Sequence, residues 1–273
     1  MKPKAITFDF WGTLFTEGEA FLEKVMPARY EILLDALSEA GHPVDEAEVR
    51  EAYRQASLAF EEAWKAGGHM PVYERVARIF ALLGAPHDPG LIALTARRLE
   101  ESPLLAPLKP LPGVEVLKDL AKKYPLAIVS DTGMTPGRLL REHLKRQGLD
   151  VFQAFSFSDE TGFVKPKPEA FRVALEALGV APEEALHVGD LPQTDIKGAF
   201  GTGYPWAVQY VGLREVNGEV RPTAKVKDHR ELLSLRTWWK PSPRRSGSRK
   251  GSTGRSSRGS GGSRTGWSSS SSR

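Results

Sequence analysis

The stretch AITFDFWGTL, residues 5–14, decides the fold of this chain. Its first six residues, Ala5 to Phe10, form an apolar run typical of a buried β-strand, and Asp9 places a carboxylate near the end of that run. Gly12 then lets the backbone turn sharply, while Thr13 supplies a hydroxyl that can orient the carboxylate. The stretch therefore predicts a strand that leads directly into a functional turn.

Four later apolar runs, each bounded by turn residues, also predict strands. They cover Leu126 to Ser130, Ala154 to Phe157, Ala185 to Val188 and Trp206 to Val211. Segments of helical periodicity accompany them, at Pro112 to Lys123, Pro136 to Gln147, Pro168 to Leu178 and Gln193 to Phe200. Because strands that alternate with such helices form parallel sheets with right-handed crossovers, the predicted fold class is α/β with a parallel sheet.

Between about Phe15 and Pro110 the pattern changes to one helix after another, with no predicted strand. Apolar residues recur at three- and four-residue spacing in four segments, Phe21 to Ala40, Asp45 to Ala66, Val72 to Leu83 and Leu91 to Glu101. We expect an all-helical domain inserted between the first strand and the rest of the sheet. The alternative is an independent helical bundle joined to the sheet.

The composition indicates a soluble, cytoplasmic protein with no membrane partner. No apolar run approaches the roughly 18 residues that a membrane span needs. The first predicted strand begins after only Lys2 and Lys4, which leaves no room for a secretion signal. The chain contains no cysteine, which excludes disulfides, a thiol nucleophile and a cysteine-based zinc site.

Residues 236–273 differ in composition from the rest of the chain. They hold ten of the 38 lysines and arginines and none of the 34 acids, so residues 1–235 carry 28 basic and 34 acidic side chains. This balance argues against nucleic-acid binding except through the basic tail. The tail, rich in Arg, Ser and Gly, is predicted to be disordered, and is either a native segment or a GC-rich coding region read in the wrong frame.

Polar residues cluster at the ends of three predicted elements. Ser130-Asp131-Thr132 follows the second strand, Lys165-Pro166 precedes a helix, and Gly189-Asp190, with Asp195 shortly after, follows the fourth strand. Because the carboxyl ends of parallel strands form a common crevice, we expect these side chains to meet Asp9 there.

These residue types suit phosphoryl transfer. A carboxylate such as Asp9 can attack phosphorus and form an aspartyl phosphate, which divides one difficult hydrolysis into two easier steps. Ser130 offers a hydroxyl to a phosphate oxygen, and Lys165 can neutralise charge on the nucleophile and on the transferring group.

The acidic residues also predict a Mg²⁺ site. Magnesium takes few hard oxygen ligands from a protein and keeps several waters. The carboxylates of Asp9 and Asp190 and the backbone carbonyl of Trp11 could supply these oxygens, and Asp195 would act next to the ion or through water. The alternative for Asp195 is to cap the helix expected to begin near Ile196.

In this order, the motifs DFWGT (9–13), SDT (130–132), KPKPEAF (165–171) and GDLPQTD (189–195) resemble those of the haloacid dehalogenase superfamily, over roughly residues 4 to 235. The resemblance implies a Rossmann-like core in residues 1–15 and 108–235, a mobile helical cap in residues 16–107 and the tail in 236–273. It also implies Asp9 as nucleophile, with Thr13 orienting it, Ser130 and Lys165 on the phosphoryl group, and Mg²⁺ on Asp9 and Asp190.

Trp11 departs from the pattern of the superfamily's phosphatases, which usually carry a second aspartate there. That aspartate protonates the leaving oxygen, and indole cannot. Losing a positioned acid costs on the order of 10²- to 10⁴-fold in rate, so activity would be confined to good leaving groups unless the cap supplies an acid. The predicted function is a Mg²⁺-dependent phosphatase acting on a small phosphorylated metabolite.

Three alternatives stay open. An aromatic residue two positions after the nucleophile also resembles the 2-haloacid dehalogenases, although those enzymes replace the acidic fourth motif that Asp190 and Asp195 preserve. Phosphonate cleavage would need a cap lysine, Lys24 or Lys65. The third is a low-turnover binding protein on the same fold.

Two further expectations concern His187 and the stretch from Trp64 to His69. His187 is predicted to be a packing residue at the end of a strand. The stretch from Trp64 to His69 is predicted to form a cap loop near the substrate. The sequence does not predict the substrate itself or the oligomeric state.

Overall fold

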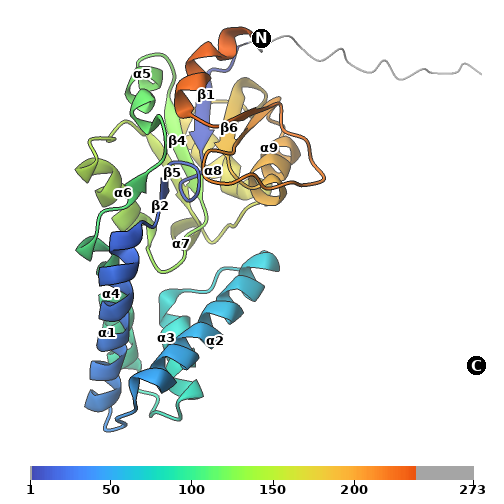
Figure 1. Cartoon of the computed structure of the whole chain (residues 1–273). Helices are drawn as coiled ribbons and strands as arrows, with labels where there is room; N and C mark the ends of the chain where they lie inside the picture. The colour runs from blue at the N-terminus through green and yellow to red at the C-terminus, as the bar shows by residue number, and fades with distance from the viewer. Residues whose placement is uncertain (1, 238–273) are drawn as a thin grey trace, which may run out of the picture. The chain divides into compact units, whose positions relative to one another are not determined.

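The centre of the structure is a six-stranded sheet in which every pairing is parallel. The computed structural model describes residues 2–237. The strand order is β5-β4-β1-β6-β7-β8 (Figure 1). The strands are β1 Ala5–Phe8, β4 Leu126–Ser130, β5 Ala154–Phe157, β6 Ala185–Gly189, β7 Trp206–Tyr210 and β8 Ala224–Val226. The predicted α/β class with a Rossmann-like parallel sheet is confirmed.

β1 ends at Phe8 rather than at the predicted Phe10. The carbonyl of Phe10 accepts the backbone N–H groups of Leu14 and Phe15, at 2.9 and 3.1 Å, and so closes a tight loop instead of continuing the sheet. Asp9 still donates its N–H to the carbonyl of Val188 at 2.9 Å. Asp9 therefore lies just beyond the strand. The edge strand β8 was not predicted, because three residues are too short for a detectable alternation.

The prediction of no strand between Phe15 and Pro110 is wrong at both ends of that interval. β2 Phe15–Thr16 and β3 Lys109–Pro110 form an antiparallel pair in which Phe15 faces Pro110 and Thr16 faces Lys109. The chain thus leaves the sheet and returns to it through the same two-stranded ribbon.

Four long helices lie between the two strands of the ribbon (Figure 1). They are α1 Met26–Glu39, α2 Glu46–Lys65, α3 Val72–Leu82 and α4 Pro89–Glu101. The first predicted helix begins as a π-helix, Phe21–Val25, which continues directly into α1, where Pro27 lies in the first turn. A 3₁₀ helix, Ser102–Leu105, follows α4.

Two of the predicted helices around the sheet begin differently in the structure. Gly113, at φ 79°, breaks the helix expected from Pro112, so that a 3₁₀ turn Val114–Val116 precedes a short α5. The helix expected from Gln193 begins as a π-helix, Pro192–Ile196. The α-helices are α5 Leu117–Ala121, α6 Gly137–Arg146, α7 Ser158–Thr161, α8 Pro168–Leu178 and α9 Lys197–Thr202. Two 3₁₀ helices, Pro182–Glu184 and His229–Thr237, complete the described elements.

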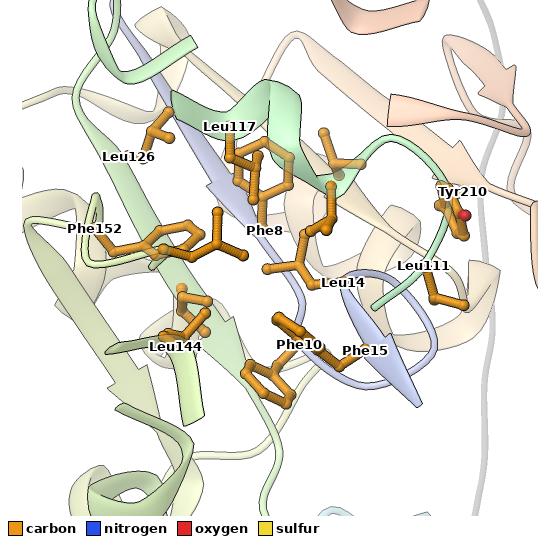
Figure 2. Close-up of a cluster of buried hydrophobic side chains, with 14 of the residues drawn as sticks. Phe8, Phe10, Leu14, Phe15, Leu111, Leu117, Leu126, Leu144, Phe152 and Tyr210 are labelled. Atoms are coloured by element: carbon orange, nitrogen blue, oxygen red, sulfur yellow. The ribbon is translucent and has the colours of Figure 1, made fainter. Parts of the chain in front are cut away.

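The sheet and the helical segment have separate hydrophobic cores. One core packs side chains of β1 and the following loop, such as Phe8, Phe10 and Phe15, against α5 and β4 (Figure 2). A second core joins α1 to α4 through residues such as Leu37 and Phe80. Each cluster stabilises its own part of the chain, because burying apolar surface is the dominant favourable contribution to folding.

The domain boundaries at residues 15/16 and 107/108 stay a prediction. The predicted tail, residues 236–273, lies outside the described residues except for its first two positions, where the 3₁₀ helix His229–Thr237 ends. Within residues 2–237, none of the helices has the length and apolar character needed to cross a bilayer.

Candidate active site

The sheet topology brings the polar motifs together. β1 lies between β4 and β6, so the residues at the carboxyl ends of these three strands share one edge of the sheet. Asp9, Ser130 and Asp190 occupy those positions. All three side chains are buried. The structure thus places the first, second and fourth motifs side by side, as the topology of a parallel sheet requires.

Both carboxylate oxygens of Asp9 accept hydrogen bonds. Oδ1 accepts from Lys165 Nζ at 2.6 Å and from Ser130 Oγ at 2.9 Å, and Oδ2 accepts from Thr13 Oγ1 at 3.2 Å. Every residue predicted to serve the nucleophile contacts it directly. Their catalytic roles stay predictions.

Lys165 is shared between two buried carboxylates. Its ammonium also donates to Asp195 Oδ1 at 2.6 Å, and the side chains of Lys165 and Asp195 are 4% and 1% exposed. The backbone N–H of Leu191 holds the other oxygen of Asp195 at 2.9 Å. Asp195 therefore orients Lys165 and the turn before α9, rather than capping a helix.

His187 is a hydrogen-bonding member of the site, not only the packing residue that was predicted. Its Nε2 lies 3.3 Å from Asp195 Oδ1 and its Nδ1 lies 2.9 Å from Thr7 Oγ1. Burial lowers the pKa of His187 below its ordinary value. A neutral ring with the proton on Nε2 satisfies both contacts, since a carboxylate can only accept.

The three acidic residues Asp9, Asp190 and Asp195 differ in how their pKa values are shifted. Burial raises the pKa of Asp9 from 3.8 to about 6, although Lys165 opposes the shift. Burial, together with the nearby charges of Asp9 and Asp195, raises the pKa of Asp190 to about 8. Burial would also raise the pKa of Asp195, but Lys165 and His187 hold it below its ordinary range. Asp190 is thus the carboxylate that most lacks a positive partner.

Asp9, Asp190 and Asp195 form a candidate metal site. One oxygen from each lies within 4.8 Å of the others. Among the described residues, the only ion-pair partner of Asp190 is the solvent-exposed Arg214, at 3.5 Å, and such an exposed pair contributes little. Three buried hard oxygen donors suit a divalent cation such as Mg²⁺.

Position 12 must be glycine because its backbone lies very close to the carboxylate of Asp190. Its φ of 72° lies in the left-handed region, and a Cβ there would be 2.6 Å from Asp190 Oδ2. The turn after β1 can therefore approach Asp190 only without a side chain. Gly189 is similarly constrained, since its Cβ would lie 2.2 Å from Asp195 Cγ.

A cavity of about 550 Å³ opens above Asp9 and is lined by Trp11, Lys165, Asp190 and Asp195 together with side chains of α1, α2 and α3. Trp11 packs edge-on against Phe10, with ring centroids 5.1 Å apart. The exposed Lys24 and Lys65 do not line the cavity. Neither lysine is placed to form the Schiff base that phosphonate cleavage needs.

Trp64 and Asp131 connect the helical segment to the sheet. Trp64 Nε1 donates to Asp131 Oδ2 at 2.8 Å, and the backbone N–H of Lys165 donates to Asp131 Oδ1 at 3.0 Å. His69 Nδ1 lies 3.4 Å from Ser158 Oγ. Trp64 and Lys65 are the last residues of α2 rather than part of the predicted loop, and Trp64 lines the cavity. That the stretch from Trp64 to His69 lies near the substrate stays a prediction. The role of Asp131 was missed, because nothing in the sequence marks Trp64 as its partner.

Comparison with known proteins places these observations in a family. The sequence model of the haloacid dehalogenase-like hydrolases matches residues 3–202. A phosphoserine phosphatase of Thermus thermophilus is 41% identical over 123 residues, which make up 45% of this chain and 49% of that protein. The chain thus matches about half the length of that relative.

Two further similarities cover more of the chain. A glyceraldehyde 3-phosphate phosphatase of Methanopyrus kandleri is 29% identical over 239 residues, 85% of this chain and 96% of the relative. The crystal structure of a 2-haloacid dehalogenase from Pseudomonas syringae matches with a TM-score of 0.65 and 24% identity, over 88% of this chain and 100% of that one. At that identity the structural likeness shows the fold alone.

Proposed function

The chain belongs to the haloacid dehalogenase-like hydrolase family, and we propose that it is a Mg²⁺-dependent phosphatase that acts on a small phosphorylated metabolite through an aspartyl phosphate on Asp9. The observation that carries this proposal is the arrangement around Asp9. A buried carboxylate that contacts Lys165 and Ser130, beside the unneutralised Asp190, is equipped to bind a phosphoryl group and a cation together.

The reaction follows from these contacts. A carboxylate oxygen of Asp9 attacks phosphorus while the bond from phosphorus to the leaving oxygen breaks, and that oxygen takes a proton. Water then attacks phosphorus in the aspartyl phosphate, loses a proton, and releases inorganic phosphate and the free carboxylate. Lys165 and Ser130 stabilise the negative charge on the transferring oxygens in both steps.

The residues present fit Mg²⁺. Asp9, Asp190 and the carbonyl of Trp11 would hold it, with Asp195 beside it. Mutual repulsion contributes to the raised pKa of Asp190, and a divalent cation would relieve that repulsion. When bound, the ion supplies positive charge that offsets the charge of the phosphoryl group.

Trp11 cannot protonate the leaving oxygen. We propose that residues 16–107 act as a cap over the cavity and that Glu17, which lines the cavity, is the acid within it. Burial raises the pKa of Glu17 above its ordinary value, which favours the protonated form that an acid needs. The relatives suggest phosphoserine and glyceraldehyde 3-phosphate as candidate substrates. A cytoplasmic location, proposed from the absence of cysteine, fits such metabolites.

The test is phosphate release by the full chain from p-nitrophenyl phosphate, acetyl phosphate and glycerol 3-phosphate, with and without Mg²⁺. We expect release that requires Mg²⁺ and favours the two activated compounds. Asp9→Asn is the blank. Halide release from 2-chloropropionate without Mg²⁺, and no phosphate release, would instead assign the chain to the dehalogenases.

A further inference from the structure

Two buried arginines lie on the helical side of the cavity. Arg29 of α1 and Arg75 of α3 are 4% and 5% exposed, and both line the cavity that contains Asp9. Arg29 donates from Nε to Ser102 Oγ at 3.0 Å and from Nη1 to Tyr53 Oη at 3.1 Å. Arg75 donates from Nη2 to Ser57 Oγ at 3.4 Å. All of these acceptors are uncharged hydroxyls.

Each guanidinium has a buried nitrogen without a hydrogen-bond partner. These atoms are Nη2 of Arg29 and Nε of Arg75. Among residues 2–237, no carboxylate oxygen lies within 4.0 Å of either group. Arg29 lies over the ring of Phe21 and Arg75 over the ring of Phe60, but neither guanidinium has an anionic partner. Because buried charges are nearly always paired, two unpaired guanidinium groups on one cavity favour an anionic ligand there.

The two arginines belong to one cluster, because they are joined through α2. Tyr53 and Ser57, one helical turn apart, accept from Arg29 and Arg75 respectively, and both line the cavity. The repulsion between the guanidinium groups adds to burial in lowering the pKa of Arg75. An anion between them would remove that repulsion.

Glu17 is not the anion that pairs with these two arginines. It lines the same cavity, but among residues 2–237 it forms no ion pair within 4.0 Å of the Arg29 guanidinium, and its pKa is raised rather than lowered. A carboxylate in a closed ion pair with a guanidinium would have a lowered pKa.

We propose that Arg29 and Arg75, with the hydroxyls of Tyr53 and Ser57, bind a second anionic group of the substrate while its phosphoryl group lies at Asp9. The inference rests on the proposed function and specifies its substrate class, a short phosphate monoester that also carries a carboxylate or a second phosphate. Guanidinium groups recognise both anions through paired hydrogen bonds. A cavity of about 550 Å³ is of the size that encloses small ligands.

The experiment compares compounds that differ only in this second group. The full chain is assayed for kcat/KM with 3-phosphoglycerate, which has a carboxylate, with glycerol 1,3-bisphosphate, which has a second phosphate, and with glycerol 3-phosphate, which has neither. Charge-assisted hydrogen bonds contribute enough to predict a preference of about ten- to hundredfold for one or both anionic compounds. Which of the two is preferred identifies the anion.

Substitution then assigns the preference to the two arginines. Arg29→Met and Arg75→Met should each reduce the ratio of kcat/KM between the preferred compound and glycerol 3-phosphate toward one. The matched control is Arg78→Met, an exposed arginine on α3, which should leave the ratio unchanged. A folding defect would lower kcat/KM for both compounds and would not change their ratio.

A binding measurement separates failure of this inference from failure of the proposed function. Asp9→Asn protein is titrated calorimetrically with 3-phosphoglycerate, the bisphosphate and glycerol 3-phosphate. Tighter binding of an anionic compound, lost on adding Arg75→Met, would support the anion site even if no compound is hydrolysed. Equal kcat/KM and equal affinity for all three, or a preference that survives both arginine substitutions, would overturn it.

Discussion

Lys165 on the sheet side of the cavity and the pair Arg29 and Arg75 on the helical side are equally buried, yet only the lysine has carboxylate partners. Lys165 donates to Asp9 and to Asp195 at 2.6 Å each, whereas the arginines contact neutral hydroxyls. The two sides of the cavity therefore differ in whether their buried cations are paired. At the sheet edge Lys165 already pairs with carboxylates, and only Asp190 still needs a cation. On the helical side the two arginines lack an anionic partner, which in the proposed function the substrate supplies.

The strongest test of this difference is Asp9→Asn. We expect a loss of at least about 10³-fold in turnover of every substrate, because the amide cannot act as the nucleophile. The arginine substitutions, by contrast, should affect only anionic substrates. Phosphate release under single-turnover conditions provides the measurement. Appreciable turnover by Asp9→Asn would remove Asp9 from the mechanism.

The free energy of unfolding should also distinguish Lys165 on the sheet side from Arg75 on the helical side. Lys165→Met leaves two buried carboxylates without their cation and should lower the free energy of unfolding by about 3–5 kcal/mol. Arg75→Met removes a cation that has no ionic partner and should change it by no more than about 1 kcal/mol in the absence of ligand. Urea unfolding in EDTA measures both. Equal losses would mean that Arg75 is as well paired as Lys165.

Two glycines of similar backbone conformation, Gly12 beside Asp190 and Gly41 after α1, allow a matched comparison of substitutions to alanine. Gly12→Ala should weaken Mg²⁺ activation about tenfold or more, because its Cβ would lie 2.6 Å from Asp190 Oδ2. Gly41→Ala, after α1, has a similar φ of 69° and no atom within 4 Å of its Cβ. It should cost only backbone strain, roughly 1–2 kcal/mol, and leave the Mg²⁺ dependence unchanged. Titration of activity with Mg²⁺ separates these outcomes.

The remaining prediction is a pH dependence of stability. The folded-state pKa of Asp190, about 8, and of Asp9, about 6, lie above the ordinary 3.8, so the folded protein binds more protons than the unfolded chain between these values. Without Mg²⁺, stability should therefore fall as pH rises from about 5 to 8, by on the order of a few kcal/mol, because each unit of raised pKa contributes about 1.4 kcal/mol. Asp190→Asn should flatten this trend. Unfolding curves in EDTA that become more stable with pH would contradict it.

The sequence predicted most of the fold and the inner part of the site. Bounds for β4, β5 and α8 agree with the structure, because buried apolar runs and a proline-initiated helix are local signals. The errors occur where single residues override periodicity. Gly113 delays the start of the helix that was predicted from Pro112, and β2, β3 and β8 are too short to show a pattern.

The sequence by itself determined the assembly of Asp9, Ser130 and Asp190, because residues at the carboxyl ends of parallel strands share one edge of the sheet. Only the tertiary structure decided that Trp64 reaches Asp131, that His187 contacts Asp195, and that Arg29 and Arg75 line the same cavity. These contacts depend on how helices of similar amphipathic pattern rotate and pack, and helical periodicity identifies a buried face without identifying what that face meets.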